Sequence, residues 1–232
     1  MNKGFIFSIV AGALLVSCSS KSFSGTVEDS GMNISWFGTQ DKQFTNNLEL
    51  AFERLNTFLT AQNLSQKPIQ KFIDEIIHFE SKDLFDLEMK RLTDGKMKTV
   101  PRTYVAVGDG GTLRTVSLAA YLKVHPKHSK KDFISILVHE AAHIFHSKTY
   151  GDEGMGPVWF FEGFAVVAAD QYVDEATLSM KEMQSIAESE KRGNYKKYGF
   201  MVRELNKAYP LEAMLQKAKN EPQNFLSYLG LK

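Results

Sequence analysis

The sequence predicts an α+β fold, in which a small, mostly antiparallel sheet packs on one buried helix and a helical carboxyl-terminal half follows. Three features support this prediction. Apolar residues recur at helical spacing over residues 44–62. Two β-prone runs, residues 103–107 and 115–122, flank the glycine-rich segment 108–111 and indicate a hairpin or looped strand pair. After Pro126 the apolar pattern is helical to the end of the chain.

The first residues differ from the rest of the chain. Lys3 is followed by an apolar run over residues 5–16, shorter than the roughly 20 residues that a membrane-spanning helix needs. These features are typical of a secretory signal peptide, and we expect it to occupy residues 1–17. The run ends in Leu-Val-Ser-Cys18, which resembles the bacterial lipobox and implies that Cys18 is acylated. The alternative is a plain secretory signal with an incidental thiol.

The charge balance excludes some partners. Removal of residues 1–17 takes away one of the 28 basic residues and none of the 27 acidic ones, so the remaining chain is formally neutral. Neither nucleic acid nor an anionic membrane surface is therefore indicated. The expected membrane partner is a lipid bilayer reached through acylated Cys18, at the bacterial cell envelope. Ser19, in place of an aspartate, favours the outer membrane if the organism is Gram-negative.

The composition, 43% hydrophobic and 24% charged, is that of a globular protein with one sizeable core. Residues 18–43, rich in small polar side chains, are expected to form a tether. We place a single domain at residues 44–232, with a first part at 44–150 and a helical part at 151–232. Residues 69–79 fit a strand or a short helix, and we favour a strand. Helices are expected at residues 44–62, 82–92, 129–148, 158–172, 176–190 and 195–208, with a short pair within 211–229.

A His-Glu-x-x-His sequence runs from His139 to His143 in one of these helices. Positions i and i+4 share one helix face, so both imidazoles can bind one metal ion while Glu140 lies beside them. Ser129 and Asp132 form a capping-box-like start, and the rest of the helix is apolar almost all round, which indicates burial. The pattern predicts a zinc site in which Glu140 acts as general base on a water molecule.

A single acidic residue interrupts the next apolar helix. Glu162 is the sole acid between Val158 and Ala169, and it follows His143 by 19 positions. A carboxylate in an apolar helix needs a cation. Glu162 is therefore the candidate third ligand, and three protein ligands leave the fourth position of a tetrahedral zinc ion open, as in catalytic sites.

These two motifs, His139-Glu140-x-x-His143 and the downstream Trp159-x-x-Glu162-Gly163-x-Ala165, together resemble the gluzincin zinc peptidases. The similarity is greatest to the peptidase MA-like families and the aminopeptidase N family, and it covers roughly residues 103–232. It implies a thermolysin-like catalytic core, one Zn²⁺ ion and a peptide or protein substrate. The residues that it assigns are the ligands His139, His143 and Glu162 and the base Glu140.

The resemblance also points to a tyrosine. In peptidase MA-like proteins a tyrosine on the helix after the glutamate helix often stabilises the oxyanion, and Tyr195 matches this position. Tyr198 is the alternative, and either can instead be an ordinary surface or core tyrosine. Asp170 is a candidate hydrogen-bond acceptor for a zinc-bound imidazole or an exposed acid. His146 is expected to pack rather than to bind metal, because the metzincin glycine and third histidine are missing.

The sequence departs from the aminopeptidase N family at one segment, and this departure bears on the type of peptidase activity expected. That family anchors the substrate amino terminus with a Gly-x-Met-Glu-Asn segment, whereas the corresponding residues 110–114 contain no glutamate and are expected to form a turn. We therefore expect an endopeptidase. The alternatives are a catalytically idle gluzincin-like lipoprotein used for binding or assembly, and a hydrolase of another bond. Retention of both histidines and both glutamates favours an enzyme.

Overall fold

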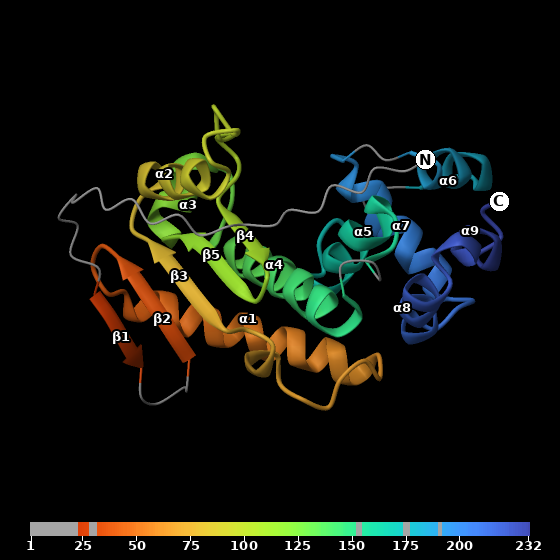
Figure 1. Cartoon of the computed structure of the whole chain (residues 1–232), viewed down its shortest axis with the longest axis horizontal. Coiled ribbons are helices and arrows are strands. Elements are labelled where there is room, and N and C mark those ends of the chain that lie inside the picture. Colours follow the sequence, from red (N-terminus) through yellow and green to blue (C-terminus); the bar gives the residue numbers. More distant parts are fainter. Residues whose placement is uncertain (1–22, 28–31, 152–154, 174–176, 190–191) are drawn as a thin grey trace.

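The computed structural model describes residues 23–27, 32–151, 155–173, 177–189 and 192–232 and shows an α+β protein (Figure 1). The expected signal peptide, residues 1–17, and the acylation site Cys18 lie outside these ranges. Within them, no helix is long and apolar enough to cross a membrane.

The strands in the described part of the chain are β1 (Phe23–Val27), β2 (Met32–Phe37), β3 (Glu75–Phe79), β4 (Ala106–Asp109) and β5 (Thr112–Val116). They form one mixed sheet, in the order β1-β2-β3-β5-β4. The pairs β1–β2 and β4–β5 are antiparallel, whereas β2–β3 and β3–β5 are parallel. The expectation of a mostly antiparallel sheet is therefore wrong. Connections that contain helices separate β2 from β3 and β3 from β5, and such crossovers return the chain in the same direction.

Two of these strands correct the tether expected at residues 18–43. Strands β1 and β2 both lie in that segment, so ordered structure begins well before residue 44. Ile34 and Trp36 of β2 are 0% and 2% exposed, and the Trp36 ring packs edge-on against Phe44 at 5.7 Å between centroids. Their burial makes β2 part of the core, although the surrounding polar residues hide its alternating pattern in the sequence.

A second correction concerns the strand expected at residues 115–122. Strand β5 ends at Val116, and the next residues form the helix α3, Leu118–Val124. The Ser117 side chain accepts a hydrogen bond from the Ala120 backbone N–H and so caps this helix. Similarly, the run at 69–79 divides into a 3₁₀ turn, Ile69–Lys71, and strand β3. The predicted hairpin is confirmed as β4–β5, with Gly110 and Gly111 at positive φ in its turn. Its first strand is shifted from the predicted 103–107 to Ala106–Asp109, so Gly108 and Asp109, expected in the turn, belong to the strand.

The remaining helices are α1 (Lys42–Ala61), α2 (Lys82–Leu92), α4 (Lys130–Tyr150), α5 (Val158–Ala168), α6 (Met180–Ala187), α7 (Tyr195–Asn206), α8 (Leu211–Asn220) and α9 (Phe225–Tyr228). Most lie close to their predicted ranges, but the helix predicted at 158–172 ends at Ala168, and within the described residues the one predicted at 176–190 spans only Met180–Ala187. Helix α4 begins at the predicted capping box of Ser129 and Asp132 and lies between the sheet and the helical half, in contact with α1, β4 and α5 (Figure 1).

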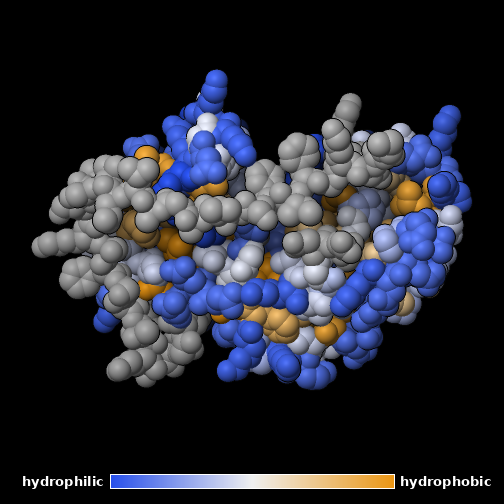
Figure 2. Space-filling model, viewed as in Figure 1, coloured by the Kyte–Doolittle hydropathy of each residue, from blue (hydrophilic) through white to orange (hydrophobic). Residues whose placement is uncertain are grey.

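Helices α5 and α7 approach each other at two glycines. A Cβ atom on Gly163 would lie 2.7 Å from the Tyr198 carbonyl oxygen, and one on Gly199 would lie 2.4 Å from the Val166 side chain. Only glycine permits this separation. On the outer face in Figure 2, hydrophilic residues cover most of the coloured surface over α8 and α9, and hydrophobic residues show as small separate areas. The close α5–α7 contact is itself buried, and α5 also packs against α4.

Candidate metal centre

Two helices bring the three predicted ligands together. His139 and His143 project from α4, and Glu162 projects from α5. The two Nε2 atoms are 3.1 Å apart, and Glu162 Oε2 lies 3.2 Å from His143 Nε2 and 3.6 Å from His139 Nε2. The three side chains are almost fully buried. Among the described residues, no other group of three or more His, Cys, Asp or Glu side chains meets at metal-binding distances.

These separations fit a shared metal ion. In a tetrahedral site with bonds of about 2.1 Å, ligand atoms lie about 3.4 Å from one another. The three measured separations, 3.1, 3.2 and 3.6 Å, bracket that value. The group is therefore compatible with a bound metal ion, held by two imidazole nitrogens and one carboxylate oxygen.

Different neighbours hold the two imidazoles. The amide oxygen of Gln171 lies 3.1 Å from Nδ1 of His139, so it can accept the Nδ1–H hydrogen bond that leaves Nε2 free for a metal. The ring of His143 instead stacks on Phe161, with 4.1 Å between ring centroids and 25° between planes. The sequence-based candidate for the supporting acceptor, Asp170, is exposed, because α5 ends before it.

Glu140 lies next to the ligand group and is held by the sheet. Its Oε2 accepts a hydrogen bond of 2.8 Å from the backbone N–H of Gly108 in β4. A Cβ atom at Gly108 would lie 2.1 Å from the Glu140 carbonyl oxygen. A glycine in β4 is thus required for the strand to approach α4 this closely.

The charges of the site are set by burial and by one another. Burial raises the pKa of Glu140 to about 7, although the positive charge of His139 and the Gly108 hydrogen bond oppose this shift. Burial also lowers the pKa of His143 to about 4, so its imidazole is neutral, as metal ligation requires. Burial would also raise the pKa of Glu162, but the hydrogen bonds from His139 and His143 lower it well below the usual range.

The site opens into a cavity of about 1010 Å³. Tyr195, half-buried at the start of α7, lines this cavity, and its ring centroid is 6.2 Å from that of His139. Burial raises the pKa of Tyr195, as does the nearby charge of Glu162, so its hydroxyl keeps its proton at neutral pH. Tyr198 is 2% exposed and belongs to the hydrophobic core rather than to the cavity wall.

Arg192 is a cavity residue that the sequence analysis missed. Its Nη1 lies 3.2 Å from Glu162 Oε1, the carboxylate oxygen that faces away from the histidines. Gln171 was not predicted either. Both residues lie in loops that follow helices, and only the tertiary fold brings their side chains to the site. Neither position carries a sequence signal, because arginine and glutamine are ordinary in polar loops.

The other histidines have different surroundings. His146 is buried among Tyr150, Phe160, Phe161 and Phe164, in agreement with the prediction that it packs. His125 and His128 line the cavity beside Tyr121, whose hydroxyl lies 2.5 Å from His128 Nδ1.

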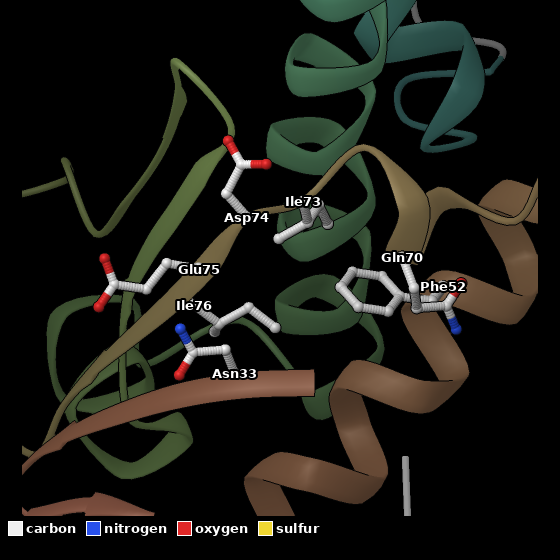
Figure 3. Close-up of a pocket in the computed structure, with 7 residues that line it drawn as sticks. All are labelled: Asn33, Phe52, Gln70, Ile73, Asp74, Glu75 and Ile76. Carbon is white, nitrogen blue, oxygen red and sulfur yellow. The ribbon is translucent and has the colours of Figure 1, made fainter. Parts of the chain in front are cut away.

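A second hollow, of about 80 Å³, lies between β2, β3 and α1 (Figure 3). Its two carboxylates are those of Asp74 and Glu75, and both point away from Phe52 in the figure. Asp74 pairs with Lys148 at 2.6 Å, and Glu75 accepts a hydrogen bond of 2.8 Å from Ser35. Both acids are therefore paired within the fold, and the metal centre remains the candidate functional site.

No protein-family model matches the chain, and no curated protein matches its sequence.

Proposed function

We propose that this protein is a zinc-dependent peptidase of the gluzincin type that acts as an endopeptidase. The observation that carries the proposal is the convergence of His139, His143 and Glu162 at ligand separations, with Glu140 beside them and a large cavity in front. A zinc ion bound by this set would supply the Lewis acidity that activates water at neutral pH. Among divalent metals, two imidazoles and a carboxylate suit zinc well.

The residues around the ligands fit peptide hydrolysis. Glu140, held beside the ligand group by the Gly108 N–H, is placed to take a proton from the attacking water and to return it to the leaving amine. Tyr195 keeps its hydroxyl proton and faces the same cavity, so it can donate a hydrogen bond to the oxyanion. The cavity volume is at the upper end of the range for small-molecule sites, about 1,000 Å³, and accommodates a peptide segment.

Metal analysis followed by peptide cleavage tests this proposal. The purified protein should contain about one zinc ion per chain, and His139→Ala should contain much less. Glu140→Gln should retain zinc and lose peptide hydrolysis by several orders of magnitude, because it keeps the shape of the side chain and removes the base. A parent protein without stoichiometric zinc would refute the metallopeptidase. Zinc binding without cleavage of any peptide in a library would favour the catalytically idle, ligand-binding alternative.

We also propose that the enzyme is anchored at the bacterial cell envelope through lipid on Cys18. The support is the lipobox-like end of the apolar amino-terminal run. One acyl chain anchors a protein only marginally, so stable attachment needs the several chains of a bacterial lipoprotein cysteine. Cys18→Ala should move the protein from the membrane fraction to the soluble fraction, and its retention in the membrane would contradict acylation.

A further inference from the structure

The turn after α5, residues 169–173, carries the side chain that supports the metal ligand His139. The Gln171 amide oxygen lies 3.1 Å from His139 Nδ1. Metal binding through Nε2 requires the proton on Nδ1, and an acceptor opposite Nδ1 favours that tautomer and fixes the ring orientation. The position of this turn therefore sets how well Gln171 supports His139 as a metal ligand.

The backbone of the turn is in a costly conformation. Asp170 and Tyr172, on either side of Gln171, have φ values of 52° and 53°. The left-handed region is disfavoured for residues other than glycine, by about 1 kcal/mol or more for a bulky residue such as tyrosine. Two residues in this conformation flank Gln171, and such a backbone is maintained only where surrounding contacts stabilise it.

Arg203, on α7, supplies those contacts to the far end of the turn. Its Nη2 donates a hydrogen bond of 2.6 Å to the Gln171 carbonyl oxygen, and its Nη1 donates one of 3.4 Å to that of Tyr172. The planar guanidinium can bridge two carbonyl groups at once, which a lysine ammonium cannot do with the same geometry. The glycine contact between α5 and α7 brings Arg203 within reach, since Gly199 lies one turn before it.

Arg54, on α1, holds the near end. Its Nη2 donates to the Ala169 carbonyl oxygen at 3.1 Å, and its Nη1 donates to Ser135 Oγ of α4 at 3.3 Å. Arg54 thus links the start of the turn to α4, which carries the two histidines. Arg203 links the end of the turn to α7, which carries Tyr195. Of the two arginines, only Arg203 bonds to the backbone of Gln171 itself.

We propose that Arg203 is a positioning residue for the metal centre, which acts through Gln171 to fix the orientation and tautomer of His139. This inference rests on the metal-binding part of the proposed function and not on peptide hydrolysis. It predicts that loss of the Arg203 hydrogen bonds weakens metal binding only while the Gln171 amide is present.

A double-mutant cycle on zinc affinity tests the inference. Zinc dissociation constants are measured by competition with a chromophoric chelator for the parent, Arg203→Met, Gln171→Leu and the double variant. Loss of a partner that supports a metal ligand typically weakens binding about 10–100-fold, and each single variant should do so. The double variant should be no weaker than Gln171→Leu alone, because both changes remove one support.

Lys207→Met is the matched control on the same helix. Lys207 is an exposed partner of Glu204, so this variant should bind zinc like the parent. Arg203→Lys retains the charge and one of the two carbonyl contacts, and it should bind zinc with intermediate affinity even if Arg203→Met folds poorly. Imidazole ¹H–¹⁵N spectra of the zinc-loaded protein add a second readout. The His139 Nδ1–H proton, which faces the Gln171 amide oxygen, should exchange slowly with solvent in the parent and faster in Gln171→Leu and in Arg203→Lys.

Two results would overturn the inference. The first is a zinc affinity of Arg203→Met and Arg203→Lys equal to that of the parent. The second is that Arg203→Met lowers zinc affinity by the same factor in the parent background and in the Gln171→Leu background. A parent that binds zinc but cleaves no peptide would refute the peptidase and leave the inference standing. A parent that binds no zinc would refute both.

Discussion

Acidification should destabilise the fold through His78 of β3, which is 1% exposed. Its ring packs between Trp36 and Phe44, with centroid distances of 4.9 and 4.4 Å. Neither ring nitrogen has a hydrogen-bond partner within the described part of the chain. Burial lowers the pKa of His78 to about 4, and the nearby charges of Asp41 and Glu80 oppose this shift without reversing it.

The direction of the change in the free energy of unfolding with pH follows from which state binds more protons. The unfolded chain protonates this histidine below its ordinary pKa of 6.5, whereas the folded chain resists protonation down to about pH 4. Between these values the unfolded state binds more protons, so the free energy of unfolding falls as the pH falls. At about 1.4 kcal/mol per pH unit, the full loss is about 3 kcal/mol. That is a large part of the roughly 5–15 kcal/mol that stabilises a typical domain.

Urea unfolding at pH 7, 6, 5 and 4.5 measures this loss against His78→Leu. Leucine fills much of the same apolar space and binds no proton, so the contribution of the other titrating groups cancels in the difference between the two proteins. The parent should lose about 2 kcal/mol more than the variant by pH 4.5, with most of the divergence below pH 6. Parallel stability curves for the two proteins would refute the reasoning.

Two predictions concern the candidate active site. Tyr195→Phe should lower kcat about 10²–10³-fold with zinc content unchanged, because it removes the hydroxyl donor that faces the cavity. Tyr198→Phe, in the core, should keep a kcat near that of the parent. Equal losses of kcat in the two variants would contradict the assignment of Tyr195. Gly108→Ala should lower stability by about 1–3 kcal/mol and also lower kcat, because its Cβ would meet the Glu140 carbonyl oxygen at 2.1 Å and push β4 off α4. Thermal unfolding measures the loss of stability, and steady-state kinetics measures the loss of kcat. If Gly108→Ala matched the parent in both, the close approach of β4 to α4 would not be required.

The helical part of the fold could be predicted from local pattern. The capping box of Ser129 and Asp132 and the i, i+4 spacing of His139 and His143 are properties of a few neighbouring residues. Strand direction could not be predicted in this way. The parallel pairs β2–β3 and β3–β5 join segments far apart in the chain, and their side chains carry no mark of direction.

The amino-terminal strands show the same limit. Residues 23–27 and 32–37 look like a polar tether in the sequence, yet β2 buries Ile34 and Trp36 against α1 and β3. A strand of this kind is stabilised mainly by its partners, so its composition alone is a poor guide. The misassigned strand after Val116 has a local cause, since the Ser117 cap starts a helix in a β-prone run.

The sequence by itself predicted the candidate ligand group, because His139 and His143 share one helix face and the isolated Glu162 needs a cation. Only the tertiary structure decided what supports that set. Gly108 holds Glu140, and Gln171 faces His139, only because β4 and the turn after α5 are packed against α4. These contacts join residues about 30 positions apart, and they depend on where helices end and how closely they approach, which no local pattern encodes.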